Sequence, residues 1–243
     1  MDPKAVWHVN QRMCQLDDQQ FSASLQLDKP SLGLLDTQVH GELVGNHQFL
    51  KIIQQDENET AEVSDFFIRG SDLVVTFAQH KERSVQPQVY WRYSRFDDST
   101  FVVDIVISVQ TSLLESNPTI SVQSIVQNAK LLEWNKQQLT PIEWGDRGFA
   151  ESSGVAVCQF ADSNVSFMTA VHPSDFHSLR FERTVMGNTE RTVLKLELFQ
   201  HELEKGVIRR GRVRGVFLQA GNELEVARKI SEDLANQPPP LTT

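Results

Sequence analysis

The sequence has few cysteines and no long apolar run. Its 243 residues include only two cysteines, Cys14 and Cys158, which cannot form a disulfide framework and match no closely spaced metal-binding pattern. No segment approaches the roughly 20 apolar residues that span a membrane. Residues 1–8 also lack the apolar core of a secretory signal. We therefore expect a cytoplasmic protein with no membrane partner.

Basic residues are outnumbered by acidic ones. Lysine and arginine total 23, aspartate and glutamate total 32, and the formal net charge at pH 7 is −9. Nucleic-acid binding draws much of its affinity from neutralising phosphates, and anionic membrane surfaces attract basic segments. The charge balance therefore argues against a nucleic-acid partner and gives no general attraction to membranes.

Several catalytic motifs are missing. The sequence contains no glycine-rich phosphate loop, no Gly-x-Ser-x-Gly, no His-Glu-x-x-His and no Cys-x-x-Cys. His201-Glu202 begins like a zinc motif, but no second histidine follows at the required spacing. Without these motifs, the sequence gives no reason to expect a cofactor or a metal.

What the sequence does have is alternation of apolar and polar residues with a period of two. The longest case is residues 100–110, where five apolar residues face one way and polar residues face the other; the apolar set is Phe101, Val103, Ile105, Ile107 and Val109. Shorter runs occur at 21–27, 73–77, 89–93 and 120–126. Such alternation favours antiparallel pairing over a buried parallel sheet. We predict an all-β chain, a large antiparallel β-sandwich in a single domain over residues 1–237.

One helix is expected, near the carboxyl end. Asn222 is a candidate N-cap, and Glu225 completes a capping-box pattern over a helix at 222–236. One face of this helix would carry Leu224, Ala227, Ile230 and Leu234. Three prolines from Pro238 end the helix, so residues 238–243 should form an extended tail.

Three hairpins are predicted in the second half. Residues 155–160 and 165–171 flank a turn at 161–164, and residues 179–185 reach a turn at 186–188. A third hairpin would join 194–198 to 207–218, with Glu197 opposite Arg210 and Leu194 opposite Val213. The leucines of 194–198 would face the core, and Lys195 and Glu197 would face outward. A slip of one residue would place leucines opposite arginines, so the apolar pattern selects this register.

The densest polar cluster is His172-Pro173-Ser174-Asp175-Phe176-His177, which follows a predicted strand. Loops at strand ends often carry catalytic groups, and His172, Asp175 and His177 could act as general acid and base or hold a metal. Arg180 would then bind substrate. The alternative is a turn in which Asp175 caps backbone amides and the histidines are exposed.

Two further sets have a functional and a structural interpretation. Arg210, Arg212 and Arg214 project from one strand face, either as donors to an anion or a sugar, or as a surface ladder paired with Glu197 and other cross-strand acids. Arg212 and His80 are candidate substrate-binding residues brought beside the 172–177 loop. A further aromatic pair, Trp91 and Tyr93, could stack on a sugar, but core packing is the favoured interpretation.

The last strands carry the strongest resemblance to a known group. Leu196-Glu197-Leu198-Phe199, followed by the run from Leu203 to Arg210, resembles the galactose-mutarotase-like supersandwich proteins. The resemblance implies a large β-sandwich and an association with carbohydrates. Asn46-His47 is followed by Gln48 and Phe49, which departs from the mutarotase catalytic pattern, so no catalytic residue is carried over.

Two functions follow as hypotheses. The first is a carbohydrate-binding domain with sugar isomerase or epimerase activity as its extension, and a carbohydrate as ligand. The second is a non-catalytic structural or protein-interaction β-sandwich. The sequence leaves the oligomeric state open.

Overall fold

The computed structural model describes residues 6–54, 60–79, 84–145, 148–152, 154–175, 177–199 and 201–238. It confirms an all-β architecture in which neighbouring strands pair antiparallel. Among the described residues, no helix is long and apolar enough to cross a membrane. Predicted residue His80 and nearly all of the predicted tail lie outside the described residues.

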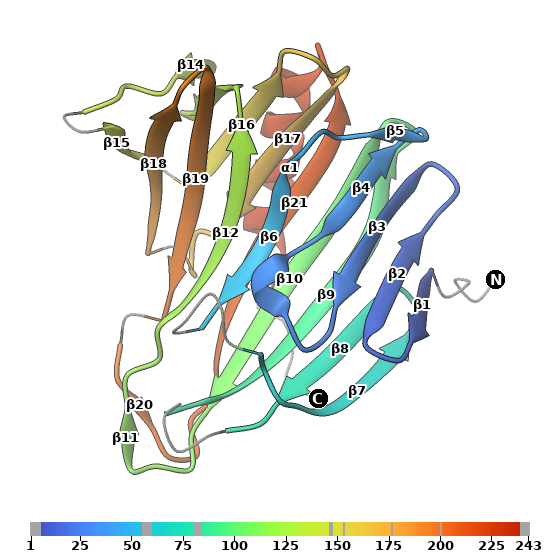
Figure 1. Ribbon diagram of the computed structural model, residues 1–243. Coiled ribbons are helices and arrows are strands. Elements are labelled where there is room, and N and C mark those ends of the chain that lie inside the picture. Colours follow the sequence, from blue (N-terminus) through green and yellow to red (C-terminus); the bar gives the residue numbers. More distant parts are fainter. Residues whose placement is uncertain are drawn as a thin grey trace.

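Two layers of sheet form the sandwich (Figure 1). The back layer is a nine-stranded sheet. In sheet order its strands are β14 (Leu139–Pro141), β13 (Ala129–Trp134), β16 (Val155–Phe160), β17 (Val165–Val171), β21 (Arg209–Gln219), β10 (Thr100–Gln110), β9 (Gln86–Asp97), β8 (Asp72–Phe77) and β7 (Val63–Arg69).

The front layer consists of two five-stranded sheets joined by a bridge between Leu34 and Phe49. The first contains β1 (Trp7–Asn10), β2 (Met13–Asp17), β3 (Phe21–Gln26), β4 (Leu35–Val39) and β5 (Glu42–Leu43). The second contains β15 (Phe149–Ser152), β18 (Ser178–Met186), β19 (Thr189–Leu198), β12 (Ile120–Gln127) and β6 (Gln48–Ile53). A 3₁₀ turn, η1 (Pro30–Leu32), and a small pair, β11 (Glu115–Ser116) with β20 (Leu203–Glu204), complete the layers.

The core between the layers is the one that the alternation predicts. The five alternate apolar residues of β10 from Phe101 to Val109 that were predicted to face one way are all fully buried there. Trp91 and Tyr93 are buried beside them, which confirms the core interpretation for both aromatics. The hairpins β16–β17 and β18–β19 also form as predicted.

The third predicted hairpin is wrong. Strand β19 pairs with β12 and β18 in the front layer, whereas β21 lies between β10 and β17 in the back layer. The two strands face each other across the core, and Leu198 contacts Gly211 there. The apolar pattern fixes which side of each strand is buried, and packing face to face satisfies that pattern as well as pairing side by side does.

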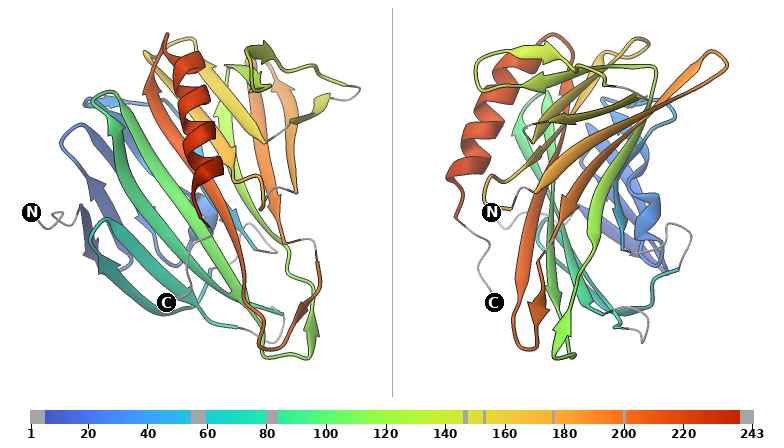
Figure 2. Two further views of the ribbon diagram at one scale, coloured as in Figure 1. Left: turned by 180° about the vertical axis from the view of Figure 1, so that it is seen from behind. Right: turned by 90° about the vertical axis from the view of Figure 1, so that its left-hand side faces the viewer.

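Helix α1 (Glu223–Asn236) covers the outer face of the back sheet, as Figure 2 shows. It packs there through Val226, Ala227, Ile230 and Leu234. The predicted contact of Leu224 is wrong, because that side chain is 51% exposed. Glu223 takes the buried position of the first turn instead and accepts hydrogen bonds from Ser166 Oγ at 2.7 Å and Gln159 Nε2 at 3.0 Å.

The predicted capping box is also absent from the described helix end. Asn222 occupies the N-cap position without a side-chain capping bond. The carboxylate of Glu223, not of Glu225, accepts the bond from a preceding backbone amide, that of Gly221, at 2.9 Å. Burial of Glu223 against the sheet places it within reach of this amide, so the tertiary contact decides the cap.

Candidate functional site

The outward face of the second front sheet carries two rows of mostly polar side chains. Side chains alternate across a strand, and the alternate neighbours Ile52, Val122 and Leu196 lie in the core. The first row crosses four strands as Ile53, Ser121, Glu197 and Ser178. The second crosses five as Lys51, Gln123, Lys195, Arg180 and Glu151. Regular antiparallel pairing therefore brings together groups that are far apart in the sequence.

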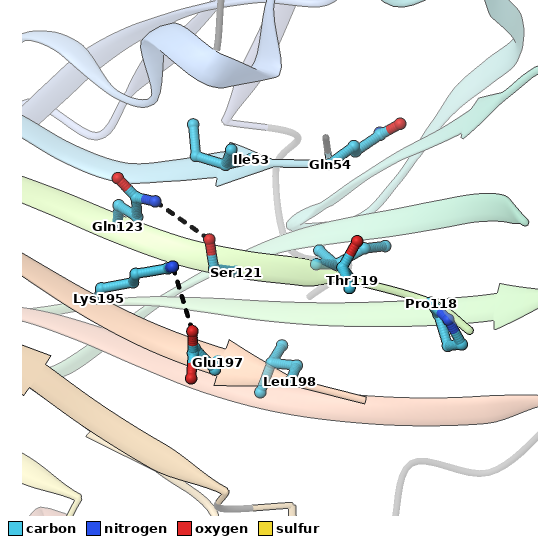
Figure 3. A pocket seen from close by; sticks show the side chains of 10 residues that line it. Ile53, Gln54, Pro118, Thr119, Ser121, Gln123, Lys195, Glu197 and Leu198 are labelled. Carbon is cyan, nitrogen blue, oxygen red and sulfur yellow. Dashed lines mark hydrogen bonds and ion pairs between the residues drawn. The ribbon is translucent and has the colours of Figure 1, made fainter. Parts of the chain in front are cut away.

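A cavity of about 260 Å³ lies over one end of these rows, where β6 and β19 end and β12 begins. Its ten lining residues, drawn in Figure 3, are Ile53, Gln54, Pro118, Thr119, Ile120, Ser121, Gln123, Lys195, Glu197 and Leu198. The polar groups come mainly from β12 and β19, and Ile53, Pro118 and Leu198 add apolar surface. The cavity is slightly smaller than the roughly 300–1,000 Å³ of drug-sized sites.

The carboxylate of Glu197 is the centre of this polar cluster. It receives a hydrogen bond from Ser178 Oγ at 2.8 Å and an ion pair from Lys195 Nζ at 3.1 Å, and Arg180 Nη1 lies 3.8 Å away. Burial alone would raise the pKa of Glu197, but these hydrogen bonds and cations outweigh it and lower the pKa below its usual value. Glu197 is therefore ionised at neutral pH and acts as a hydrogen-bond acceptor.

Donors and acceptors alternate around the carboxylate. Gln123 Nε2 donates to Ser121 Oγ at 3.1 Å on the adjacent strand, and Figure 3 shows both side chains beside the Lys195–Glu197 pair. An ammonium group donates only, a carboxylate accepts only, and an amide or hydroxyl does both. The cavity can thus satisfy neighbouring hydroxyl groups that each both donate and accept.

The predicted residues His172, Asp175 and Arg212 come together in the back layer. Arg212 Nε donates to Asp175 Oδ2 at 2.8 Å, and Arg212 Nη1 donates to the carbonyl of Pro238 at 2.9 Å. Ser174 Oγ donates to Asp175 Oδ1 at 2.7 Å and lies 2.8 Å from His172 Nδ1. This network ties the loop and the chain after α1 to β21. None of its side chains lines the cavity in the front layer.

His172 is mostly buried within this network. Burial, followed by the charge of Arg212, lowers its pKa, while Asp175 and the Gln237 carbonyl oppose the shift. Its Nε2 has no well-formed hydrogen bond among the described residues. The ring is therefore held in its neutral form by its surroundings, as expected for a packed histidine.

The other predicted residues lie apart from the network. His177 is exposed, and Arg180 projects from β18 on the outer face of the front sheet, where it lies near Glu151 and Glu197. The described residues contain no group of three His, Cys, Asp or Glu side chains that could hold a metal ion. Arg180 is thus the one described member of the predicted set that borders the cavity's polar row.

The arginine row is not the surface ladder of the structural interpretation. Arg212 and Arg214 are buried beneath α1 and the chain that follows it, and Arg210 Nε donates to Ser108 Oγ at 2.9 Å. Arg214 binds Asp104 of β10 and Asp233 of α1. The expected pairing with Glu197 is wrong, because Glu197 lies in the other layer, but the expected pairing with a cross-strand acid is confirmed for Arg214, which lies opposite Asp104.

Two cavity residues, Ser121 and Gln123, were missed in the sequence. The signal was present in the alternation of residues 120–126, since inward Ile120 and Val122 require Ser121 and Gln123 to face outward. Lys195 and Glu197 were predicted to face outward. What the pattern lacked was the order of strands that places these residues side by side.

No protein-family model matches the chain, and neither does any curated protein. Solved structures share its fold. A putative aldose 1-epimerase from Klebsiella pneumoniae aligns with 98% of this chain and 90% of its own length, at a TM-score of 0.58 and 9% identity. A galactose mutarotase-like protein from Lactobacillus casei aligns with 84% of this chain and 99% of its own, at a TM-score of 0.51 and 10% identity.

A larger protein has a similar region. A TPR-domain containing protein from Parabacteroides distasonis matches 95% of this chain at a TM-score of 0.61 and 10% identity, and the chain spans about half (49%) of that protein's length. At these identities the likeness concerns the fold alone. The fold is that of galactose-mutarotase-like proteins, as the resemblance in the last strands predicted.

Proposed function

We propose that this chain, which has the fold of galactose-mutarotase-like proteins, binds a carbohydrate in the cavity over β12 and β19. The observation that carries the proposal is the Lys195–Glu197 pair beside Gln123 and Ser121 in this cavity. Fold alone is an associational argument. The proposal therefore rests on the match between these groups and a polyhydroxylated ligand.

Each group has a role in such binding. Glu197 accepts hydrogen bonds from two neighbouring hydroxyls, and charge-assisted bonds of this kind are among the strongest available to a neutral ligand. Lys195 and Gln123 donate to sugar oxygens, while Ile53, Pro118 and Leu198 contact the apolar C–H face. The volume of about 260 Å³ suits one sugar residue better than a chain of several.

Isomerase or epimerase activity would extend the proposal, and it requires more than binding. Opening or epimerising a sugar needs a proton acceptor and a proton donor on different sides of the ring. Glu197 supplies an acceptor, and among the ten lining residues it is the only carboxylate, with no histidine present. We therefore propose carbohydrate binding as the main function and catalysis only as its extension.

The proposed setting is the cytoplasm, with no nucleic-acid or membrane partner. The two cysteines, Cys14 and Cys158, are free and buried. Burial raises the pKa of Cys14 to about 12, which leaves it as a thiol. Free thiols suit a reducing compartment, where disulfides are rare.

The test is a thermal-shift screen against neutral sugars, amino sugars and uronic acids, because a ligand of the native state raises its melting temperature. We expect at least one class to stabilise the protein. Glu197→Gln should weaken that ligand roughly 10- to 100-fold by calorimetry, since a hydrogen bond to a charged group is lost.

A matched control is Glu182→Gln, which neutralises another outward carboxylate of the same sheet outside the cavity. It should leave the affinity unchanged. Equal affinity in Glu197→Gln and wild type would contradict the assigned cavity. Absence of any stabilising sugar would favour the non-catalytic interaction domain instead.

A further inference from the structure

Strand β7 is an edge with exposed aromatic side chains. It is the last strand of the nine-stranded sheet and, among the described strands, pairs on one side only, with β8 (Figure 1). Phe66 and Phe67 are adjacent and so face opposite sides of the sheet, and each is 42% exposed. Monomeric proteins usually protect such an edge, because unpaired backbone groups beside apolar side chains can form hydrogen bonds with a strand of another chain.

The turn at Gly70-Ser71 determines which backbone groups of β7 are free. Arg69 and Asp72 flank this two-residue turn and pair directly, so they exchange both of their backbone hydrogen bonds. Bonding alternates along an antiparallel strand, so Phe67 also bonds toward β8. The N–H and C=O groups of Phe66 and Ile68 therefore point outward, away from the sheet.

The sequence of β7 is complementary to itself in one antiparallel register. We propose that β7 pairs with β7 of a second copy of this chain, with Phe67 opposite the partner's Phe67 on a two-fold axis. Asp65 then lies opposite the partner's Arg69, and Phe66 opposite the partner's Ile68. The outward backbone groups of Phe66 and Ile68 meet as hydrogen-bonded pairs, and the two back sheets become one continuous sheet.

Charge selects this register over its neighbours. Centring the pair on Phe66 places Asp65 opposite the partner's Phe67, and centring it on Ile68 places Arg69 opposite the partner's Phe67. Only the register centred on Phe67 joins opposite charges, twice by symmetry. Cross-strand pairs of this kind favour one alignment over another.

Both charged groups are available within one copy. Asp65 is exposed and has no ion pair with any other described residue. Arg69 Nη2 lies 3.8 Å from Asp72, a carboxylate that Arg92 already binds through two hydrogen bonds of 2.8 Å. Turning Arg69 toward the partner's Asp65 therefore leaves Asp72 paired.

Cross-linking tests the register directly. Opposite residues of a non-hydrogen-bonded pair have Cα atoms about 4.5 Å apart, within disulfide range. Phe67→Cys should therefore form a disulfide-linked dimer under mild oxidation. Ile68→Cys is the matched control, since the two substituted positions would lie about 8 Å apart and beyond disulfide reach. The native cysteines are buried and should not interfere.

Charge reversal tests the same interface without a cross-link. Sedimentation of the wild type should show the 27.6 kDa chain shifting to twice that mass as concentration rises. Asp65→Arg and Arg69→Asp should each weaken the dimer about tenfold or more, because two pairs become repulsive. The double variant should restore it. Glu182→Arg, an equal charge change on another strand, should have no effect.

A wild type that stays monomeric at every soluble concentration overturns the proposal, as does a Phe67→Cys variant that does not cross-link. A dimer that survives both single reversals places the interface elsewhere and overturns it too. Circular dichroism of each variant excludes misfolding as the cause of any loss, since these side chains are exposed and the fold should persist.

Discussion

Leu50 of β6 packs against Gly215 of β21 across the core. A Cβ atom on residue 215 would lie 2.6 Å from Leu50 Cδ1 and 3.1 Å from Cδ2, closer than such atoms approach. The Leu50 side chain cannot easily move away from residue 215. Leu50 is fully buried, its φ is +57°, and its amide donates to Ser124 Oγ at 3.1 Å. The two layers therefore meet at this point only because residue 215 lacks a side chain.

Gly215→Ala should lower the free energy of unfolding by about 1–3 kcal/mol, the usual cost of overpacking a core. Gly211→Ala should cost less, because the Cβ there would lie 3.1 Å from Leu198 Cδ1. Urea denaturation measures both. In Leu50→Ala/Gly215→Ala, the added methyl fills part of the cavity left by leucine, so the loss should be smaller than the sum of the single effects. Additive losses would contradict direct packing.

The Leu198–Gly211 contact also shows where prediction from sequence ends. Alternation predicted the burial of β10, turn residues predicted two hairpins, and the helical spacing of apolar residues predicted helix α1, because each depends on residues close together in the chain. Whether 194–198 lies beside 207–218 or opposite it depends on where the chain crosses between layers. Both arrangements bury the same leucines, so the pattern could not distinguish them.

For the candidate site, too, the sequence predicted which side chains face outward but not which strands lie side by side. Alternation identifies Lys195 and Glu197 as outward residues of one strand and, read in the same way, Ser121 and Gln123 as outward residues of another. Their meeting depends on the order β19-β12-β6. Conversely, the 172–177 segment was predicted as a site because four of its six residues are polar. In the fold, part of it is bound by Arg212, a residue 37 positions away from Asp175.

Arg214 should contribute strongly to stability. It donates to Asp104 through Nε and Nη2 at 2.6 and 2.9 Å and to Asp233 through Nη1 at 2.6 Å, so it joins β10 to α1. Arg214→Met leaves the partly buried carboxylate of Asp104 without its cation. We therefore expect the free energy of unfolding, measured by urea denaturation, to fall by about 3 kcal/mol. Arg228→Met, which breaks an exposed pair with Glu232 on the same helix, should cost no more than about 0.5 kcal/mol. Equal losses would contradict this role.

Stability should decrease in mild acid, in part because of His47. The ring stacks on Phe160 at 4.1 Å between centroids, and Nδ1 accepts a hydrogen bond from the Gln127 amide at 3.2 Å. Burial lowers the pKa of His47 to about 4, whereas an unfolded histidine titrates near pH 6.5. Between these values the unfolded chain binds more protons. The contribution of His47 is thus complete above about pH 6.5 and is lost as the pH falls toward 4.

His47→Asn retains an acceptor for the Gln127 amide and removes the titration. The slope of unfolding free energy against pH between 4 and 6.5 should therefore become smaller in this variant. His8→Asn changes an exposed histidine of β1 and should keep the wild-type slope. Identical slopes in His47→Asn and wild type would show that the ring is not the titrating group.

Asp175→Asn distinguishes a structural role of the 172–175 loop from a catalytic one. The Arg212–Asp175 pair is almost fully buried and anchors the loop and the chain after α1, so its loss should cost about 2–4 kcal/mol of stability. Sugar affinity should stay at the wild-type value, because the proposed cavity lies in the other layer. His177→Asn, at an exposed position of the same segment, should change neither quantity. Denaturation and calorimetry on the three proteins measure both effects. If Asp175→Asn instead keeps its stability and abolishes turnover of a bound sugar, the catalytic interpretation of His172 and Asp175 is correct and the structural one is wrong.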